Sequence, residues 1–327
     1  MQNTFEIPIL IITFNRPTHT RRVWEEVKKQ RPKYVYVFQD GARDGNDADM
    51  EKCEAVRAIF SEERDWDCEL KTNYSNINLG CGRGPVSGIS WFFEQVEQGI
   101  IMEDDCLPHP DFFGYCEELL NKYKNEPRVM VVGTTTYHND YPCDDSYLFS
   151  RYFTGGAWAG WRRAWNGFSV DLETVDVNVL KKTIRKAFYS TAETNWWVRK
   201  VKEIKADTAK KGYWDYQMQI HMLLNNGLAT RPQRNMICNI GFDPEGTHTL
   251  VNDSRGERTV FPCFPLQHPA TIKVNGKNDY LFMAKELQQR LDKRIISALY
   301  RYMNENEGGL HRLLQYYKKQ KRAWLKG

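Results

Sequence analysis

The sequence predicts an α/β fold in which a mostly parallel sheet is flanked by helices. Two observations carry this prediction. Short apolar runs rich in Val and Ile alternate with amphipathic stretches of helical periodicity through residues 1–135. Polar or glycine-containing segments follow these apolar runs, which is typical of loops at the carboxyl ends of parallel strands.

The first two strands are expected where apolar residues follow one another closely, and a third follows the second helix. Asn15-Arg16-Pro17 follows the first run and leads into an amphipathic helix. Gln39-Asp40-Gly41 follows the second run and starts a loop before the next helix. In chain order we expect strand Ile7–Thr13, helix Thr18–Gln30, strand Tyr34–Phe38, helix Ala48–Ser61 and strand Cys68–Thr72.

A glycine-rich segment, Asn78–Pro85, separates the third strand from the next helix and predicts a loop. Proline suits the first turn of a helix, so we expect this helix to begin at Pro85 and to run to Gln98. Strand Gly99–Met102, helix Asp111–Lys124 and strand Val129–Val132 complete this half of the chain.

From Thr134 onward the strand signals are weaker and aromatic residues more frequent. Helices are expected at Val177–Tyr189 and Glu193–Lys210, and a loop rich in turn residues at Cys238–Thr249. The predicted organisation is one domain made of two halves, followed by a helical basic tail. These parts would span residues 1–135, 136–270 and 271–327.

Composition narrows the class of protein. The chain has 327 residues, 41% of them hydrophobic and 27% charged, as expected for a globular protein. A formal net charge of +4 is too small to indicate nucleic acid as a partner. No signal peptide is expected at the amino terminus. The eight cysteines form no CxxC pair, which favours reduced thiols in the cytoplasm over a zinc site or a disulfide framework.

Three consecutive acids, Glu103-Asp104-Asp105, follow the predicted strand at Gly99–Met102. Adjacent carboxylates repel one another unless a cation or hydrogen-bond donors neutralise them. A hard divalent ion that also binds substrate phosphates would do so, and a solvated acidic turn is the alternative. Parallel strands would bring other loops to the same edge of the sheet. The residues expected to bind a nucleotide-sugar there are Thr13, Asn15, Arg16, Asp40, Arg83 and Gly84.

These segments together resemble nucleotide-sugar glycosyltransferases of the GT-A (Rossmann-like) fold, and most of all the family-2-like bacterial enzymes. The resemblance rests on Asn15-Arg16-Pro17, Asp40-Gly41, Asn78-Leu79-Gly80 and the acidic triplet. It extends over roughly residues 5–250, and it implies that residues 1–135 are the nucleotide-sugar-binding half and residues 136–270 the acceptor-binding half. The Glu-Asp-Asp stretch and the following Pro110-Asp111-Phe112-Phe113 also look like the metal-binding motif of N-acetylglucosaminyltransferase I.

The resemblance implies a role for each acid of the triplet. Asp105 would be the direct ligand of Mn²⁺ or Mg²⁺, and Glu103 and Asp104 would contact the metal or the ribose. The triplet is not a strict Asp-X-Asp motif. Trp158 lies in a glycine-aromatic segment that fits the bacterial branch, where it would border the sugar pocket. Core packing is the alternative for this Trp.

Two further residues are candidates for chemistry. Asp215 lies between Trp214 and Tyr216 at the start of a helical segment. It could be the general base that activates the acceptor hydroxyl, or only an acid that stabilises a helix start. In related transferases a late His completes the metal shell, which makes His248 a candidate ligand, although most loop histidines only form hydrogen bonds. Imidazole suits Mn²⁺ better than Mg²⁺.

The last eighteen residues, 310–327, combine apolar residues near helical spacing with six Lys and Arg. A basic amphipathic helix is typical of peripheral contact with an anionic membrane, here the inner face of the cell membrane. An ordinary helix that docks on the domain is the alternative.

The sequence therefore predicts a metal-dependent, inverting glycosyltransferase of the hexosyl- or N-acetylhexosaminyl-transferase type. It would move sugar from a nucleotide-sugar, with UDP as the expected nucleotide, to a glycan or glycolipid in bacterial polysaccharide biosynthesis. One alternative is a sugar-nucleotide nucleotidyltransferase. This class has a lysine-bearing glycine loop after the first strand, where the chain has Thr13-Phe14-Asn15-Arg16-Pro17. The other is a non-catalytic module that binds a glycan or a nucleotide.

Overall fold

The computed structural model describes residues 4–136, 144–188, 191–207, 213–241 and 263–283. The chain divides into two compact units, Met1–Gly276 and Lys277–Gly327. Of the second unit, residues 277–283 are described and are helical. The predicted division of the first unit near residue 135 stays a prediction.

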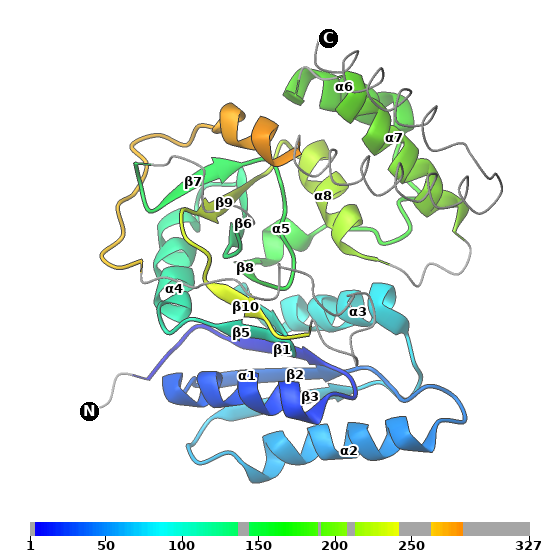
Figure 1. Ribbon diagram of the computed structural model, residues 1–327, viewed down its shortest axis with the longest axis vertical. Helices are drawn as coiled ribbons and strands as arrows, with labels where there is room; N and C mark the ends of the chain where they lie inside the picture. Colours follow the sequence, from blue (N-terminus) through cyan, green and yellow to red (C-terminus); the bar gives the residue numbers. More distant parts are fainter. Residues whose placement is uncertain (1–3, 137–143, 189–190, 208–212, 242–262, 284–327) are drawn as a thin grey trace, which may run out of the picture. The chain divides into compact units, whose positions relative to one another are not determined.

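An eight-stranded sheet forms the centre of the first unit, with strand order β3-β2-β1-β4-β8-β6-β9-β7 (Figure 1). Its first four strands run parallel to one another, which confirms the predicted α/β class. They are β1 (Ile9–Thr13), β2 (Tyr34–Gln39), β3 (Glu69–Tyr74) and β4 (Gln98–Glu103).

The other half of the sheet is mixed. β8 (Ala157–Trp161) is antiparallel to both β4 and β6 (Val129–Gly133). β9 (Leu228–Pro232) is parallel to β6, and β7 (Tyr147–Ser150) is antiparallel to β9 at the edge. A second sheet pairs β5 (Cys106–Pro108) with β10 (Ile237–Asn239) in antiparallel fashion.

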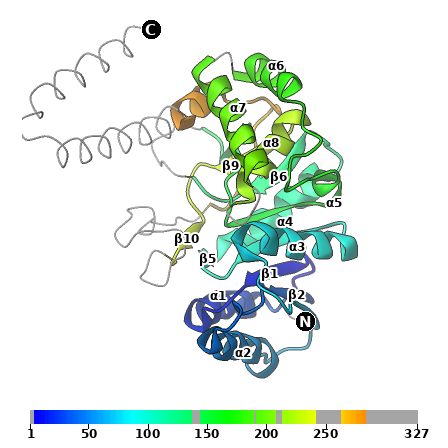
Figure 2. The ribbon, with the colours of Figure 1, turned by 90° about the vertical axis from the view of Figure 1, so that its right-hand side faces the viewer.

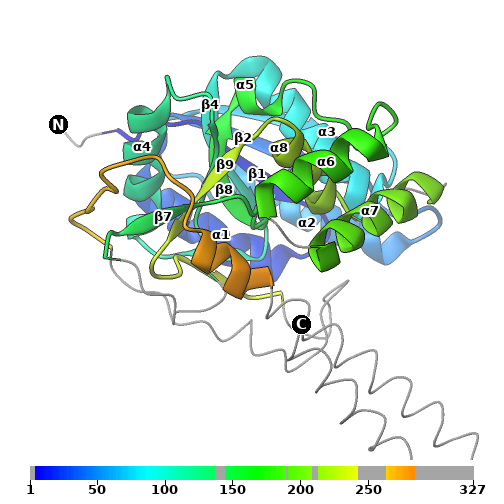
Figure 3. The same ribbon diagram turned by 90° about the horizontal axis from the view of Figure 1, so that it is seen from above.

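Helices cover both faces of the sheet (Figures 2 and 3). One apolar core joins the sheet to α1 (Pro17–Gln30), α2 (Asp47–Glu62) and α4 (Asp111–Tyr123). A second core joins it to α3 (Gly80–Gln95), α5 (Arg162–Trp165) and α8 (Asp215–Leu224). The remaining helices, α6 (Val177–Phe188) and α7 (Thr191–Ala206), contact each other, and α6 also contacts α8.

Burial on both faces explains why β1 is an uninterrupted apolar run. Ile9 and Ile11 belong to the core beneath α1, while Leu10 and Ile12 belong to the core beneath α3. Each of these side chains is at most 6% exposed. A strand with only one buried face would instead alternate apolar and polar residues.

The structure corrects the predicted glycine loop before α3. The helix begins at Gly80 instead of Pro85, so most of that segment forms its first turns and Pro85 lies inside it. Gly84 and Gly88 let this helix lie close to β2. A Cβ on Gly84 would lie 3.3 Å from Oδ2 of Asp40, and one on Gly88 would lie 2.7 Å from the Phe38 ring. The glycines are therefore a packing surface, which a helix can use as well as a loop.

The predicted start of a loop at Cys238 is also wrong, because Cys238 lies within β10, which begins at Ile237. Residues 242–262, which include most of that predicted loop, lie outside the described ranges. Within the described ranges, no helix has both the length and the apolar character that crossing a membrane requires.

Candidate metal and nucleotide site

The acidic triplet lies where the central strand β4 ends, as predicted. Glu103 is the last residue of β4, and Asp104 and Asp105 form the turn into β5. The backbone N–H of Glu103 donates to Gly156 O (3.2 Å), and that of Asp104 donates to Ile12 O (3.0 Å). Neighbouring strands on both sides thus fix the backbone of the triplet, so the three carboxylates are held at the carboxyl edge of the sheet.

Arg16 bridges two of these carboxylates. Its Nη2 lies 2.9 Å from Oδ1 of Asp104, and its Nη1 lies 3.1 Å from Oδ2 of Asp105. All three side chains are at most 18% exposed. The bridge joins the loop after β1 to the turn after β4, which confirms that these two loops converge at one edge of the sheet.

The guanidinium does not balance the acids around it. Burial, together with the neighbouring charges of Asp105 and Asp104, raises the pKa of Glu103 to about 8. Burial likewise raises the pKa of Asp104 to about 6, against the lowering effect of Arg16. Three carboxyl groups therefore crowd this buried edge with one guanidinium between them, and a further cation that displaced the proton of Glu103 would relieve the repulsion.

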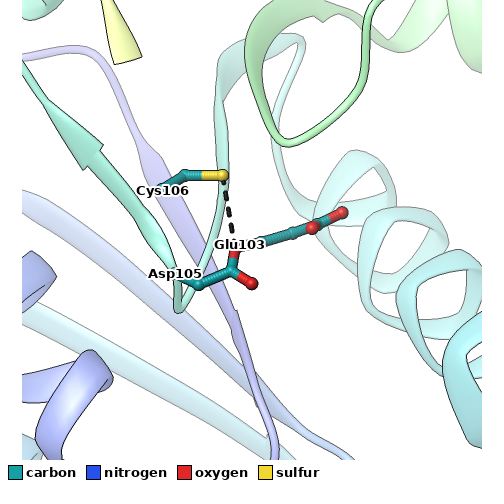
Figure 4. A group of neighbouring side chains, drawn as sticks. All are labelled: Glu103, Asp105 and Cys106. Carbon is teal, nitrogen blue, oxygen red and sulfur yellow. Dashed lines mark hydrogen bonds between the residues drawn. The ribbon is translucent and has the colours of Figure 1, made fainter. Parts of the chain in front are cut away.

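Glu103, Asp105 and Cys106 could hold that cation, because one ligand atom from each lies within 4.8 Å of the others (Figure 4). Burial raises the pKa of the Cys106 thiol well above its usual value, so the sulfur is protonated and donates to Oδ1 of Asp105 at 3.5 Å. The ligands left are carboxylate oxygens. Hard ions such as Mg²⁺ and Mn²⁺ prefer oxygen, so the donor set fits them.

Asp215, the predicted base, lies beside this cluster. It is the first residue of α8, and its Cβ lies 4.0 Å from the position that a Cβ on Gly155 would take. The next residue, Gly156, accepts the hydrogen bond from Glu103. The charge of Asp215 also contributes to the raised pKa of Glu103. The structure therefore brings together the acid of α8 and the triplet of β4, about 110 residues apart in the sequence.

The end of β10 covers one side of the triplet, and nothing in the sequence pattern pointed to it. Ile240 donates its N–H to Asp105 O (2.8 Å), and its own carbonyl lies 3.1 Å from Nε2 of His19 on α1. A Cβ on Gly241 would lie only 2.3 Å from Oδ2 of Asp105 and 2.9 Å from Nη1 of Arg16. Only glycine fits there without moving the Arg16–Asp105 pair.

Asp40 faces the start of α3. Its carboxylate accepts N–H groups from Gly41 (3.0 Å), Leu79 (2.8 Å) and Gly80 (2.9 Å). Burial raises its pKa even so. The predicted contact of Asp40 with a ribose or a base would have to share oxygens that already hold this helix start. Gly84 packs against the same carboxylate.

The remaining predicted residues are spread around this edge. The hydroxyl of Thr13 donates to Phe38 O (3.2 Å), and the Asn15 amide donates to Asp49 Oδ1 (2.6 Å). Arg83 is 44% exposed and pairs with Asp171 at 2.9 Å. Their predicted contacts with a nucleotide-sugar stay predictions.

Trp158 and His248 are the last two residues predicted for the site, and the structure describes the first of them. The structure places Trp158 in the core, 1% exposed, with Phe93, Phe153 and Trp214 around its ring. The structure thus shows the core packing that the sequence left open as the alternative, and a contact of Trp158 with the sugar stays a prediction. β8 is a central strand whose single glycine leaves room for a large ring, so the indole fills space between the sheet and α3. His248 lies outside the described residues.

No family model matches the sequence, and a search of curated proteins finds no match. Solved structures with partial likeness include mouse xyloside xylosyltransferase 1 in its apo form. It is 11% identical, with 66% of this chain and 81% of that chain covered and a TM-score of 0.34. The 4-diphosphocytidyl-2C-methyl-D-erythritol synthase of Anaerococcus prevotii is 13% identical (57% and 78% covered, TM-score 0.31).

HddC from Yersinia pseudotuberculosis, complexed with GMP-PN, is 8% identical (48% and 78% covered, TM-score 0.30). These identities and scores assign neither a family nor a reaction. The chemistry of the site therefore has to be argued from the chain's own residues.

Proposed function

We propose that the protein is a metal-dependent, inverting glycosyltransferase that takes a nucleotide-sugar, with UDP as the nucleotide, and a glycan or lipid-linked acceptor. One observation carries the proposal: the carboxylates of Glu103 and Asp105 lie together at the end of β4, and Asp215 approaches them from α8. A cation site beside a separate carboxylate is the pair that transfer from a diphosphate to a hydroxyl requires.

Breaking the bond between a sugar and a diphosphate leaves negative charge on the leaving phosphate. Glu103 and Asp105 would hold the divalent ion, which when bound stabilises that charge. Arg16 extends from the same edge of the sheet and supplies a second positive group for the phosphates. Both contributions act on the leaving group and leave the other side of the sugar for the acceptor.

Asp215 would act on that acceptor. In the proposed reaction its carboxylate takes the proton of the acceptor hydroxyl. The hydroxyl oxygen then bonds to the anomeric carbon as the bond from that carbon to the diphosphate oxygen breaks. Attack from the side opposite the leaving group inverts the anomeric configuration, and the products are the glycoside and the nucleoside diphosphate.

The metal assignment is tested with Asp105→Asn. We expect calorimetry to show that UDP binds wild-type protein in the presence of Mn²⁺ and that the substitution abolishes the metal-dependent part, because the charged ligand is lost. Asp65→Asn is a matched control, since that carboxylate is 73% exposed on the surface. Equal affinity of wild-type and Asp105→Asn protein would contradict the metal site.

The reaction type is tested by identifying products, with and without Mn²⁺, from a panel of nucleotide-sugars and from a panel of nucleoside triphosphates mixed with sugar phosphates. Release of nucleoside diphosphate supports glycosyl transfer. Release of pyrophosphate from a nucleoside triphosphate and a sugar phosphate would instead identify a nucleotidyltransferase. Binding of donor with no turnover of any substrate would identify a binding module.

A further inference from the structure

The Arg16 guanidinium is hydrogen-bonded to the carboxylate of Asp105, one of the two groups proposed to bind the metal. Its two nitrogens contact two different acids: Nη2 is bonded to Asp104 and Nη1 to Asp105. A divalent ion on Asp105 would therefore meet a positive charge already hydrogen-bonded to the same carboxylate. Like charges at such short range repel strongly at a site with little solvent.

The two contacts of Arg16 are not equivalent. Asp104 is 3% exposed, and its Oδ2 is buried without a hydrogen-bond partner among the described residues. Its other oxygen is bonded to Arg16, the nearest positive charge, and the backbone N–H of Phe14 also stabilises this carboxylate. Asp105 is more exposed, at 13% against 4% for the Asp104 side chain, and also accepts from the Cys106 thiol. The bond to Asp105 is therefore the one that can be given up at lower cost.

Packing keeps Arg16 close to this position. Pro17 begins α1 immediately after it, and the Arg16 carbonyl accepts from both the N–H (3.0 Å) and the hydroxyl (2.9 Å) of Thr20. The backbone is thus fixed and only the side chain can change partner. Gly241 lies directly against the Nη1 end of the guanidinium, so a change of partner has to direct that nitrogen toward the open edge of the sheet.

We infer that Arg16 is a built-in counter-ion of the metal site. Its guanidinium pairs with Asp105 when no metal is bound, and this bond breaks when a divalent cation binds to Asp105. Arg16 then keeps its bond to Asp104, and its freed nitrogen binds the diphosphate of the nucleotide. This makes Arg16 a positioning residue with opposite effects on two ligands, since it opposes the metal and supports the nucleotide. The inference rests on the proposed metal site.

The test uses Arg16→Gln in the full chain and measures binding of Mn²⁺ alone, from the electron paramagnetic resonance signal of free Mn²⁺. We expect the variant to bind Mn²⁺ roughly fivefold or more tightly than wild-type protein, the lower end of typical coupling between two ligands. UDP affinity in saturating Mn²⁺ should fall in the same variant. Arg21→Gln is the matched control, because Arg21 lies in α1, the helix that begins directly after Arg16, and pairs with Glu63 away from the site.

Mn²⁺ affinity that is unchanged or weaker in Arg16→Gln, while wild-type protein binds the ion, would overturn the inference and leave the metal site standing. Equal Mn²⁺ binding, or none, by wild-type and Asp105→Asn protein would instead overturn the metal site itself. If Arg16→Gln does not fold, Arg16→Lys replaces it. Lysine keeps one charge but not the two-pronged bridge, so it should bind Mn²⁺ more tightly than wild-type protein, and the opposite order overturns the inference.

Discussion

Asp215 is the residue whose role a single substitution can define. A carboxylate at the first position of a helix stabilises the helix through the dipole, and the same carboxylate beside an acceptor can take a proton. We predict that Asp215→Asn leaves donor binding and the melting temperature near wild-type values but slows transfer roughly a hundredfold or more. Initial rates at saturating donor and acceptor, together with donor calorimetry, measure both effects.

Asp176→Asn is the control for this prediction. The Asp176 side chain accepts the N–H groups of Asn178 (2.7 Å) and Val179 (3.3 Å) at the start of α6, so it is an acid with a purely structural role at a helix start. Its substitution should leave the transfer rate unchanged. A transfer rate of Asp215→Asn equal to that of Asp176→Asn would mean that the base lies elsewhere.

Residue types at the carboxyl ends of strands were predictable in part. The convergence of Arg16 with the acidic triplet follows from parallel strand order, and the structure confirms it. The hydrogen-bond partner of each polar side chain could not be predicted from strand order. Asp40 accepts three backbone N–H groups from its own and the next loop, because α3 starts at Gly80, five residues earlier than predicted. Local spacing does not encode such a partner.

Helix α3 packs on the sheet through glycine, so its position is sensitive to one added carbon. We predict that Gly88→Ala lowers the free energy of unfolding by about 1–3 kcal/mol, the usual cost of overpacking a core. The new Cβ would lie within 2.9 Å of three Phe38 atoms, and Phe38 is 1% exposed. This cost exceeds the helix propensity gained, about 1 kcal/mol. Urea denaturation measures the difference.

Glu94→Ala, on an exposed position of the same helix, is the control and should change the stability by less than about 0.5 kcal/mol. A Gly88→Ala protein as stable as wild type would show that α3 can move away from β2 without cost.

Elements with one dominant signal were predicted well, and those that depend on distant partners were not. The first strands and helices agree with the predicted ranges to within a few residues, because each is a clear apolar run or an amphipathic repeat. β5 and β10 are three residues each and exist only as a pair. β8 is rich in Gly, Ala and Trp and is a strand because β4 and β6 flank it. The residues of β8 themselves do not indicate that these two strands lie beside them.

At the scale of the whole molecule we propose that the basic tail, residues 310–327, attaches the protein to anionic membranes. These residues lie outside the described part of the chain. We predict that deleting them weakens co-sedimentation with anionic vesicles and spares hydrolysis of a soluble donor. Each Lys or Arg near such a surface contributes about 1 kcal/mol, and the tail has six.

Raising the salt concentration should release the full-length protein, since charges more than about 8–10 Å apart are screened near physiological ionic strength. Neutral vesicles provide the control. If the full-length and shortened proteins sediment equally with anionic vesicles, the tail does not bind the membrane and the alternative of a docked helix is favoured.

The way the site is assembled has a consequence for the order of folding. Arg16 follows β1, and the triplet lies at the end of β4. Asp215 begins α8, and Gly241 comes shortly after β10, the last strand in the described part of the chain. During synthesis the ribosome must release more than two thirds of the chain before these groups can meet. Until then, the acids of the triplet lack part of the surroundings that hold them in place. The affinity for Mn²⁺ would therefore report on completion of the domain, and loss of the residues after β9 would change that affinity even with the triplet intact.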